Sequence, residues 1–116
     1  MPKLIHNYAC GPEAHIQNAI FKMLTLKGWY VLETHGNMYQ RGFPDLFATH
    51  TTMRQRWIEV KNPVKYSFTP AQLETFPKLC AYGSGVWILT AATEHEYAKL
   101  MQAFNWDQYL GIYKCG

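Results

Sequence analysis

Three residues in the middle of the chain have the types and the spacing to hold a cation beside a phosphate. Glu59 and Lys61 are separated only by Val60, and side chains along a strand alternate between its faces, so both would project from one face about 7 Å apart. Asp45 begins the preceding predicted strand. A connecting loop with an odd number of residues would bring Asp45 to the same face, whereas an even loop would turn it away. This register is therefore a structural prediction in its own right.

Such a constellation would suit phosphodiester hydrolysis. Two carboxylates held close together raise one another's pKa unless a cation lies between them. Mg²⁺ prefers oxygen ligands and commonly uses one or two carboxylates with waters and a substrate phosphate. The metal can neutralise a phosphoryl oxygen, lower the pKa of a bound water and orient its attack. Lys61 would hold or activate that water or stabilise the transition state, although Glu-x-Lys alone is common on solvated strands.

The punctuation of the chain predicts the elements that must position these residues. Gly11-Pro12 precedes apolar residues at three- and four-residue spacing, which predicts a first helix that Gly28 closes. Thr69 and Pro70 are a good N-cap and a good first residue for a second helix, which Pro77 should kink or divide. The predicted elements are a helix over 12–27, strands over 29–33, 45–50, 55–61 and 86–90, and helices from 70 and from 94 to about 104.

This order, αβββαβα, predicts one α/β domain over residues 1–116, with a mixed sheet flanked by helices. The segment 106–113 would be a short strand or a packed extension. No apolar run approaches the ~20 residues that cross a bilayer, and residues 1–10 lack the apolar stretch of a signal peptide. Three cysteines without CxxC spacing favour a reducing compartment over a disulfide framework. We therefore expect a soluble cytoplasmic protein and set aside zinc binding by scattered Cys and His.

Three short motifs, taken in order, are far more specific than any one of them. They are Gly42-Phe43-Pro44-Asp45-Leu46, Trp57-Ile58-Glu59-Val60-Lys61 and Phe68-Thr69-Pro70-Ala71-Gln72. Together they resemble the signature of the PD-(D/E)XK nuclease superfamily, and more narrowly that of the virus-type replication-repair nuclease (VRR-NUC) domain. The resemblance covers roughly residues 12–90. It implies a restriction-endonuclease-like αβββαβ core.

The resemblance also implies further site residues. In that family an acidic residue of the first helix completes the metal site, and Glu13 matches it; Glu13, Ile16 and Ile20 share one helical face, although the helix dipole favours a glutamate there in any case. The carbonyl of Val60 would be another ligand, and Gln72 would orient water or Lys61. The family's arginine near residues 33–37 is missing here, which affects contacts to DNA rather than the metal site. The candidates for contacts to the phosphate backbone are Asn37, Tyr39, Gln40, Arg41, Lys65 and Tyr66.

By resemblance, the chain would be a Mg²⁺-dependent endodeoxyribonuclease, with Mn²⁺ able to substitute and no nucleotide cofactor. Stand-alone domains of this kind resemble bacterial and phage proteins that cut branched DNA, including Holliday junctions, as homodimers. A twofold dimer supplies the two symmetric cuts that a four-way junction needs. A flap- or duplex-directed nuclease and a catalytically silent DNA-binding module are the alternatives. The aromatic residues that would line the dimer interface or else close the core are Tyr97, Phe104, Trp106, Tyr109 and Tyr113.

Overall fold

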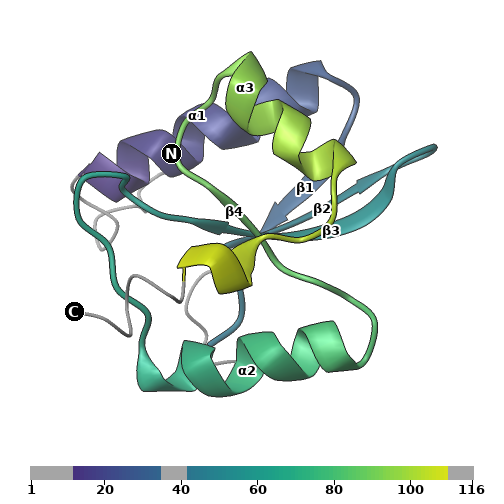
Figure 1. Ribbon diagram of the computed structural model, residues 1–116. Coiled ribbons are helices and arrows are strands. Elements are labelled where there is room, and N and C mark those ends of the chain that lie inside the picture. Colours follow the sequence, from purple (N-terminus) through teal and green to yellow (C-terminus); the bar gives the residue numbers. More distant parts are fainter. Residues whose placement is uncertain (1–11, 35–41, 110–116) are drawn as a thin grey trace.

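A four-stranded mixed sheet lies at the centre of the computed structural model (Figure 1), which describes residues 12–34 and 42–109. The strands lie in sequence order: β1 (Tyr30–Glu33), β2 (Leu46–His50), β3 (Arg54–Val60) and β4 (Trp87–Leu89). β2 runs antiparallel to both β1 and β3, and β4 runs parallel to β3. The predicted element order and the mixed α/β sheet are confirmed.

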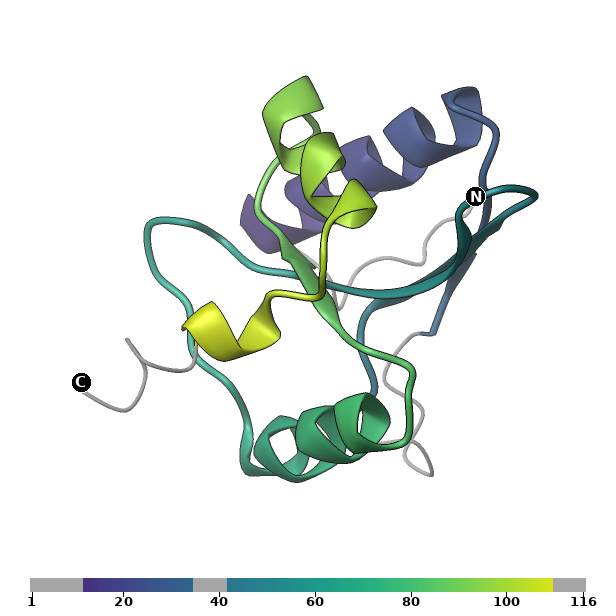
Figure 2. The same cartoon turned by 45° about the vertical axis from the view of Figure 1, so that its right-hand side comes forward.

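Helices cover the sheet from both sides. Figures 1 and 2 show α1 (Pro12–Leu26), α3 (Glu94–Tyr97) and the 3-10 helix η3 (Ala98–Met101) on one side, with α2 (Pro70–Ala81) on the other. Each side has its own apolar core, because strand side chains alternate between faces. The α1 core contains Ile20, Leu24, Leu46, Ala48, Ile58, Val60 and Leu100, and the α2 core contains Phe68, Phe76, Val86, Ile88 and Trp106.

The hairpin between β2 and β3 decides which face Asp45 joins. Leu46 pairs with Ile58 and His50 pairs with Arg54, so three residues, 51–53, connect the strands. The sequence places Arg54 in the loop, but Arg54 joins β3 with a φ of 72°. The loop is therefore odd, and continuing the register puts Asp45 opposite Glu59. Asp45 lies on the α2 side of the sheet, as Glu59 and Lys61 do.

The second helix begins as predicted. The Thr69 side chain accepts a hydrogen bond from the Gln72 backbone N–H (3.1 Å), and Gln72 Oε1 accepts one from the Thr69 N–H (3.0 Å), which forms a capping box. The prediction that Pro77 could divide this helix is wrong: α2 continues to Ala81. Proline removes a single N–H from the ladder, and the fully buried Phe76 beside it anchors the helix against the sheet.

The helix predicted to reach residue 104 ends earlier. After α3, the chain tightens into η3, and Gln102 is extended. The carbonyls of Leu100 and Gln102 accept hydrogen bonds from the side chains of Arg56 (2.9 Å) and Trp87 (3.0 Å). These side chains donate to carbonyls that would otherwise need N–H donors from further helical turns. The chain then returns to the sheet, where the Asn105 amide bonds both the N–H (2.6 Å) and the carbonyl (3.3 Å) of Ile88 and closes the outer edge of β4.

The C-terminal aromatic residues pack mainly on the core. The Trp29 indole donates to the Tyr97 hydroxyl (3.0 Å), and Trp106 is 5% exposed. Residues 106–109 are helical rather than a strand. Phe104 remains 37% exposed against Trp87, and Tyr113 lies outside the described residues. In the described part of the chain, no helix is both long and apolar enough to cross a membrane.

Candidate active site

Asp45 is held at the start of β2 by contacts on both sides. Its Oδ2 accepts a hydrogen bond from the Val60 N–H (2.9 Å). Its carbonyl accepts one from the Thr34 N–H (3.0 Å), and the Thr34 hydroxyl donates to the Pro44 carbonyl (2.6 Å). The carboxylate therefore reaches across to β3 instead of starting a turn.

The loop leading to Asp45 presses against the start of α2. Gly42 has a φ of 83°, and an added Cβ would lie 2.7 Å from the carbonyl carbon of Ala71 and 2.8 Å from Thr75 Oγ1. Glycine is required there for both its conformation and its lack of a side chain. This close approach brings the first turn of α2, with Gln72, next to the carboxylates.

Glu59 is the most buried charged residue of the site, with 2% of its surface exposed. Its Oε2 accepts hydrogen bonds from Gln72 Nε2 (2.8 Å) and lies 3.0 Å from Lys61 Nζ. Its Oε1 is also buried, and no N–H or O–H group among the described residues donates to it. A buried carboxylate oxygen without a donor is costly, so this atom lacks either a proton or a cation.

Lys61 is 5% exposed and fully engaged. Besides Glu59, its ammonium donates to the Ser67 carbonyl (2.8 Å) and, at 3.4 Å, to Gln72 Oε1. It also lies 4.8 Å from the centre of the Phe68 ring. The amine is thus held at one point beside the carboxylates, and Gln72 bridges Glu59 and Lys61 through its two ends.

The two carboxylates perturb one another. Burial and then the Asp45 charge raise the pKa of Glu59 to about 8, against the opposing effect of Lys61. Burial also raises the pKa of Asp45 to about 6, and the charge of Glu13 acts in the same direction. The Val60 N–H, Lys61 and a hydrogen bond with the Glu59 carboxyl oppose this rise, and the last requires a proton between the two carboxyls. The pair therefore retains a proton near neutral pH in the absence of a cation.

The remaining candidate ligands lie at the same end of β3. Glu13, which is exposed, accepts a hydrogen bond from the Asn62 N–H (3.2 Å). The Val60 N–H donates to the Asp45 carboxylate. The N–H and the carbonyl of one strand residue leave the strand on the same side, so the Val60 carbonyl also faces Asp45. As they stand, no three His, Cys, Asp or Glu side chains among residues 12–34 and 42–109 form a group that could hold an ion.

The unpaired oxygen of Glu59, the Asp45 carboxylate and the Val60 carbonyl nevertheless form a set of hard oxygen donors suited to Mg²⁺. Two features that sequence reasoning missed support this set: Thr34 bonds to the Asp45 and Pro44 carbonyls, and the Ser67 carbonyl binds Lys61. Neither has a sequence signal, because both contacts use backbone carbonyls.

The candidate DNA contacts are only partly described. Lys65 is exposed, whereas the ring of Tyr66 packs edge-on against Phe68 and Tyr109, with its hydroxyl buried. Tyr66 thus supports the loop between β3 and α2 more than it presents a surface. Asn37, Tyr39, Gln40 and Arg41 lie outside the described residues.

Comparison of this chain with models of protein families, with curated proteins and with solved structures found no match in any of the three.

Proposed function

We propose that this chain is a Mg²⁺-dependent endonuclease of the PD-(D/E)XK type, with a VRR-NUC-like domain in which Mn²⁺ can replace Mg²⁺. One observation carries the proposal: Glu59 Oε1 is buried without a hydrogen-bond partner, while Asp45 lies opposite on the neighbouring strand and Lys61 lies 3.0 Å from the other oxygen. A structural ion pair would satisfy both carboxylate oxygens. This one leaves an acceptor free beside a second carboxylate.

The donor set supports a divalent ion rather than a general acid alone. Asp45 and Glu59 would bind it, with the Val60 carbonyl as a third oxygen ligand and Glu13 as a more distant acid on α1. A bound Mg²⁺ would supply charge neutralisation at the phosphoryl oxygen and activation of a water molecule. The ion would also replace the proton that the carboxylate pair retains, so its binding should release a proton.

Lys61 and Gln72 would position the reacting groups. Gln72 is immobilised by the capping box of α2, and its amide nitrogen donates to Glu59 (2.8 Å). With the Glu59 charge shared by an ion, the Lys61 ammonium becomes free to stabilise the negative charge that develops on the phosphoryl group. The Ser67 carbonyl and the Phe68 ring keep it in place.

A second candidate is a nucleic-acid-binding module without catalysis. Two observations favour it: Lys61 Nζ already lies 3.0 Å from one Glu59 oxygen, and the described residues hold no group of three ligands. The substrate of the active form is proposed to be branched DNA, cut by a homodimer, with flap- and duplex-directed cleavage as the other possibilities.

The test is cleavage of labelled four-way junction, flap and linear duplex with Mn²⁺, with Lys61→Ala and Lys22→Ala compared to the unchanged protein. Lys22 is exposed on α1 and loses the same charge. Paired symmetric nicks in the junction that Lys61→Ala abolishes and Lys22→Ala retains would support junction cleavage. Binding without cleavage by the unchanged protein would support the silent module. Light scattering of the free protein tests the dimer.

A further inference from the structure

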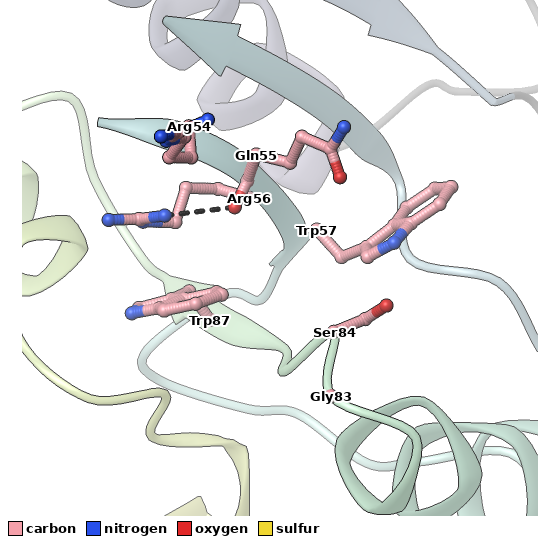
Figure 3. Close-up of a pocket in the computed structure, with 7 residues that line it drawn as sticks. All are labelled: Arg54, Gln55, Arg56, Trp57, Gly83, Ser84 and Trp87. Atoms are coloured by element: carbon pink, nitrogen blue, oxygen red, sulfur yellow. Dashed lines mark hydrogen bonds between the residues drawn. The ribbon is translucent and has the colours of Figure 1, made fainter. Parts of the chain in front are cut away.

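A polar pocket of about 270 Å³ lies at the opposite end of β3 from Lys61, between the β2–β3 hairpin and the segment that follows α2 (Figure 3). Its lining consists of Arg54, Gln55, Arg56, Trp57, Gly83, Ser84 and Trp87. The lining contains two positive charges and no acidic side chain. Its volume is just below the ~300 Å³ at which pockets for small organic ligands begin, so it suits a phosphate and its sugar better than an enclosed cofactor.

Arg56 is held rigidly without a carboxylate partner. Its guanidinium stacks over the Trp87 ring at 4.7 Å, as Figure 3 shows, and donates to the carbonyls of Leu100 and Gln55 at 2.9 Å each. These contacts orient the charge but do not neutralise it. Within the described part of the chain, no acidic side chain lies within ion-pair distance, so N–H groups remain for an external anion.

Arg54 occupies a backbone conformation that disfavours it. With a φ of 72°, it is the left-handed residue that follows a three-residue hairpin loop, a position where glycine is usual. A residue with a Cβ costs about 1 kcal/mol there. The Arg54 side chain is exposed and forms no hydrogen bond or ion pair with the residues described, so nothing in the fold compensates for the strain. Such strain points to a function of the side chain outside the fold.

A second hollow lies beside this pocket, on the α2 face of the sheet, and one of its lining residues contacts the backbone of Asp45. It has a volume of about 350 Å³, is lined largely by apolar and aromatic side chains, and shares Trp57 with the arginine pocket. Its lining is Leu32, Glu33, Thr34, Phe43, Phe47 and Trp57. Thr34 is the residue that bonds to the backbone carbonyl of Asp45. Leu32 of β1, which lines this hollow, is 45% exposed.

We propose that these two hollows form a track for a single-stranded arm of nucleic acid that leaves the active site and crosses the edge of β3 at residues 54–57, which β4 does not pair. Bases would stack on Phe47 and Trp57 on the α2 face, and a phosphate would bind Arg54 and Arg56 on the opposite face. Aromatic platforms combined with cations are how proteins bind single strands without sequence preference. Five residues of β3 separate Glu59 from Arg54, which is about 17 Å. A stacked strand of about five nucleotides spans that length.

This inference rests on the proposed nuclease only in assuming that the strand starts at the active site. Binding of the strand can be tested without cleavage. The assay measures anisotropy of a fluorescent oligothymidylate in EDTA across a salt series. Arg54→Gly is expected to weaken binding several-fold. It should also reduce the slope of log affinity against log salt by about 0.7, the value for one phosphate contact on a single strand. The Tm of this variant should be unchanged or higher, because the backbone strain is relieved. Trp57→Leu is expected to weaken binding about tenfold.

Lys22→Ala is the matched control, because it removes one positive charge from an exposed position on α1 that lines neither hollow. Equal affinity and equal salt slope for Arg54→Gly and Lys22→Ala would contradict the proposed track. Competition by inorganic phosphate as effective as that by the oligonucleotide would also contradict it. The two proposals fail separately. If only the nuclease is wrong, Arg54→Gly still weakens binding of a strand that the protein never cuts. If only the track is wrong, Arg54→Gly cuts flaps with arms of about six nucleotides as the unchanged protein does.

Discussion

Two glutamate–lysine pairs in the described part of the chain have a buried glutamate, and the pKa values of the two glutamates shift in opposite directions. Glu59 and Lys61 are 3.0 Å apart on β3, while Glu96 and Lys99 are 2.7 Å apart where α3 meets η3. Burial opposes the ionisation of Glu96 too, but hydrogen bonds from Lys99 and from the Thr90 N–H (2.9 Å) outweigh it and lower its pKa. The pKa of Glu59 is instead raised to about 8.

The difference lies in what each carboxylate meets on its other side. Both oxygens of Glu96 have donors, one from the backbone of Thr90 and one from Lys99. No second acid among the described residues shifts its pKa. Glu59 has one oxygen without a donor and shares its surroundings with Asp45. A carboxylate whose oxygens all have donors fits a structural role, whereas the unpaired acceptor of Glu59 needs another explanation, which the proposed metal site would supply.

The sharpest test of this contrast compares Glu59→Gln with Glu96→Gln in cleavage with Mn²⁺. We expect Glu59→Gln to reduce kcat by about 10²- to 10³-fold or more, because it removes a charge at the reacting centre. Glu96→Gln should retain nearly full activity below its melting temperature. Similar activity of both variants would mean that the two pairs are equivalent and that the proposed site is wrong.

Metal binding should distinguish the pairs without any substrate. Mn²⁺ at about one hundred times its Kd stabilises a protein by about 2.7 kcal/mol, which raises the Tm of a domain of this size by several degrees. The unchanged protein and Glu96→Gln should show this rise in calorimetry, and Glu59→Gln should not. A rise that persists in Glu59→Gln would place the ion elsewhere.

Removing the charge of Glu96 should weaken the fold. The Gln side chain can still accept from the Thr90 N–H but loses its charge-assisted bond with the partly exposed Lys99, so we expect a loss of about 1–2 kcal/mol in the free energy of unfolding at pH 7. Glu59→Gln should cost less in EDTA, because a neutral amide resembles the protonated carboxyl. Denaturant titration measures both values, and a reversed order would contradict the assignment.

The smallest effect is the pH dependence of stability in EDTA. The folded pKa of Glu59 lies above its ordinary value of 4.5, so its contribution is complete below pH 4.5 and is lost as the pH rises toward about 8, with a slope of at most ~1.4 kcal/mol per pH unit. Glu96 contributes to stability with the opposite pH dependence. Because its folded pKa is lowered, its contribution is present above pH 4.5 and is lost in acid. Glu59→Gln should flatten the fall between pH 5 and 8, as followed by urea unfolding; an unchanged slope would show that Glu59 is already ionised.

The sequence predicted those features that local patterns encode. Alternation along residues 57–61 placed Glu59 and Lys61 on one face, and Thr69 with Pro70 marked the start of α2 to the residue. These are effects of strand period and helix capping, which neighbouring residues determine. The metal, the DNA substrate and the dimer stay predictions.

Contacts between distant residues decided the rest. The odd hairpin loop depends on Arg54 adopting a left-handed conformation that its residue type disfavours, and the early end of the last helix depends on side chains from β3 and β4 reaching its carbonyls. Which of two Glu–Lys pairs has a free oxygen is likewise invisible in the sequence, because it depends on donors supplied by segments far along the chain. Periodicity and capping act over a few residues, but burial and hydrogen bonding are settled only when the layers pack.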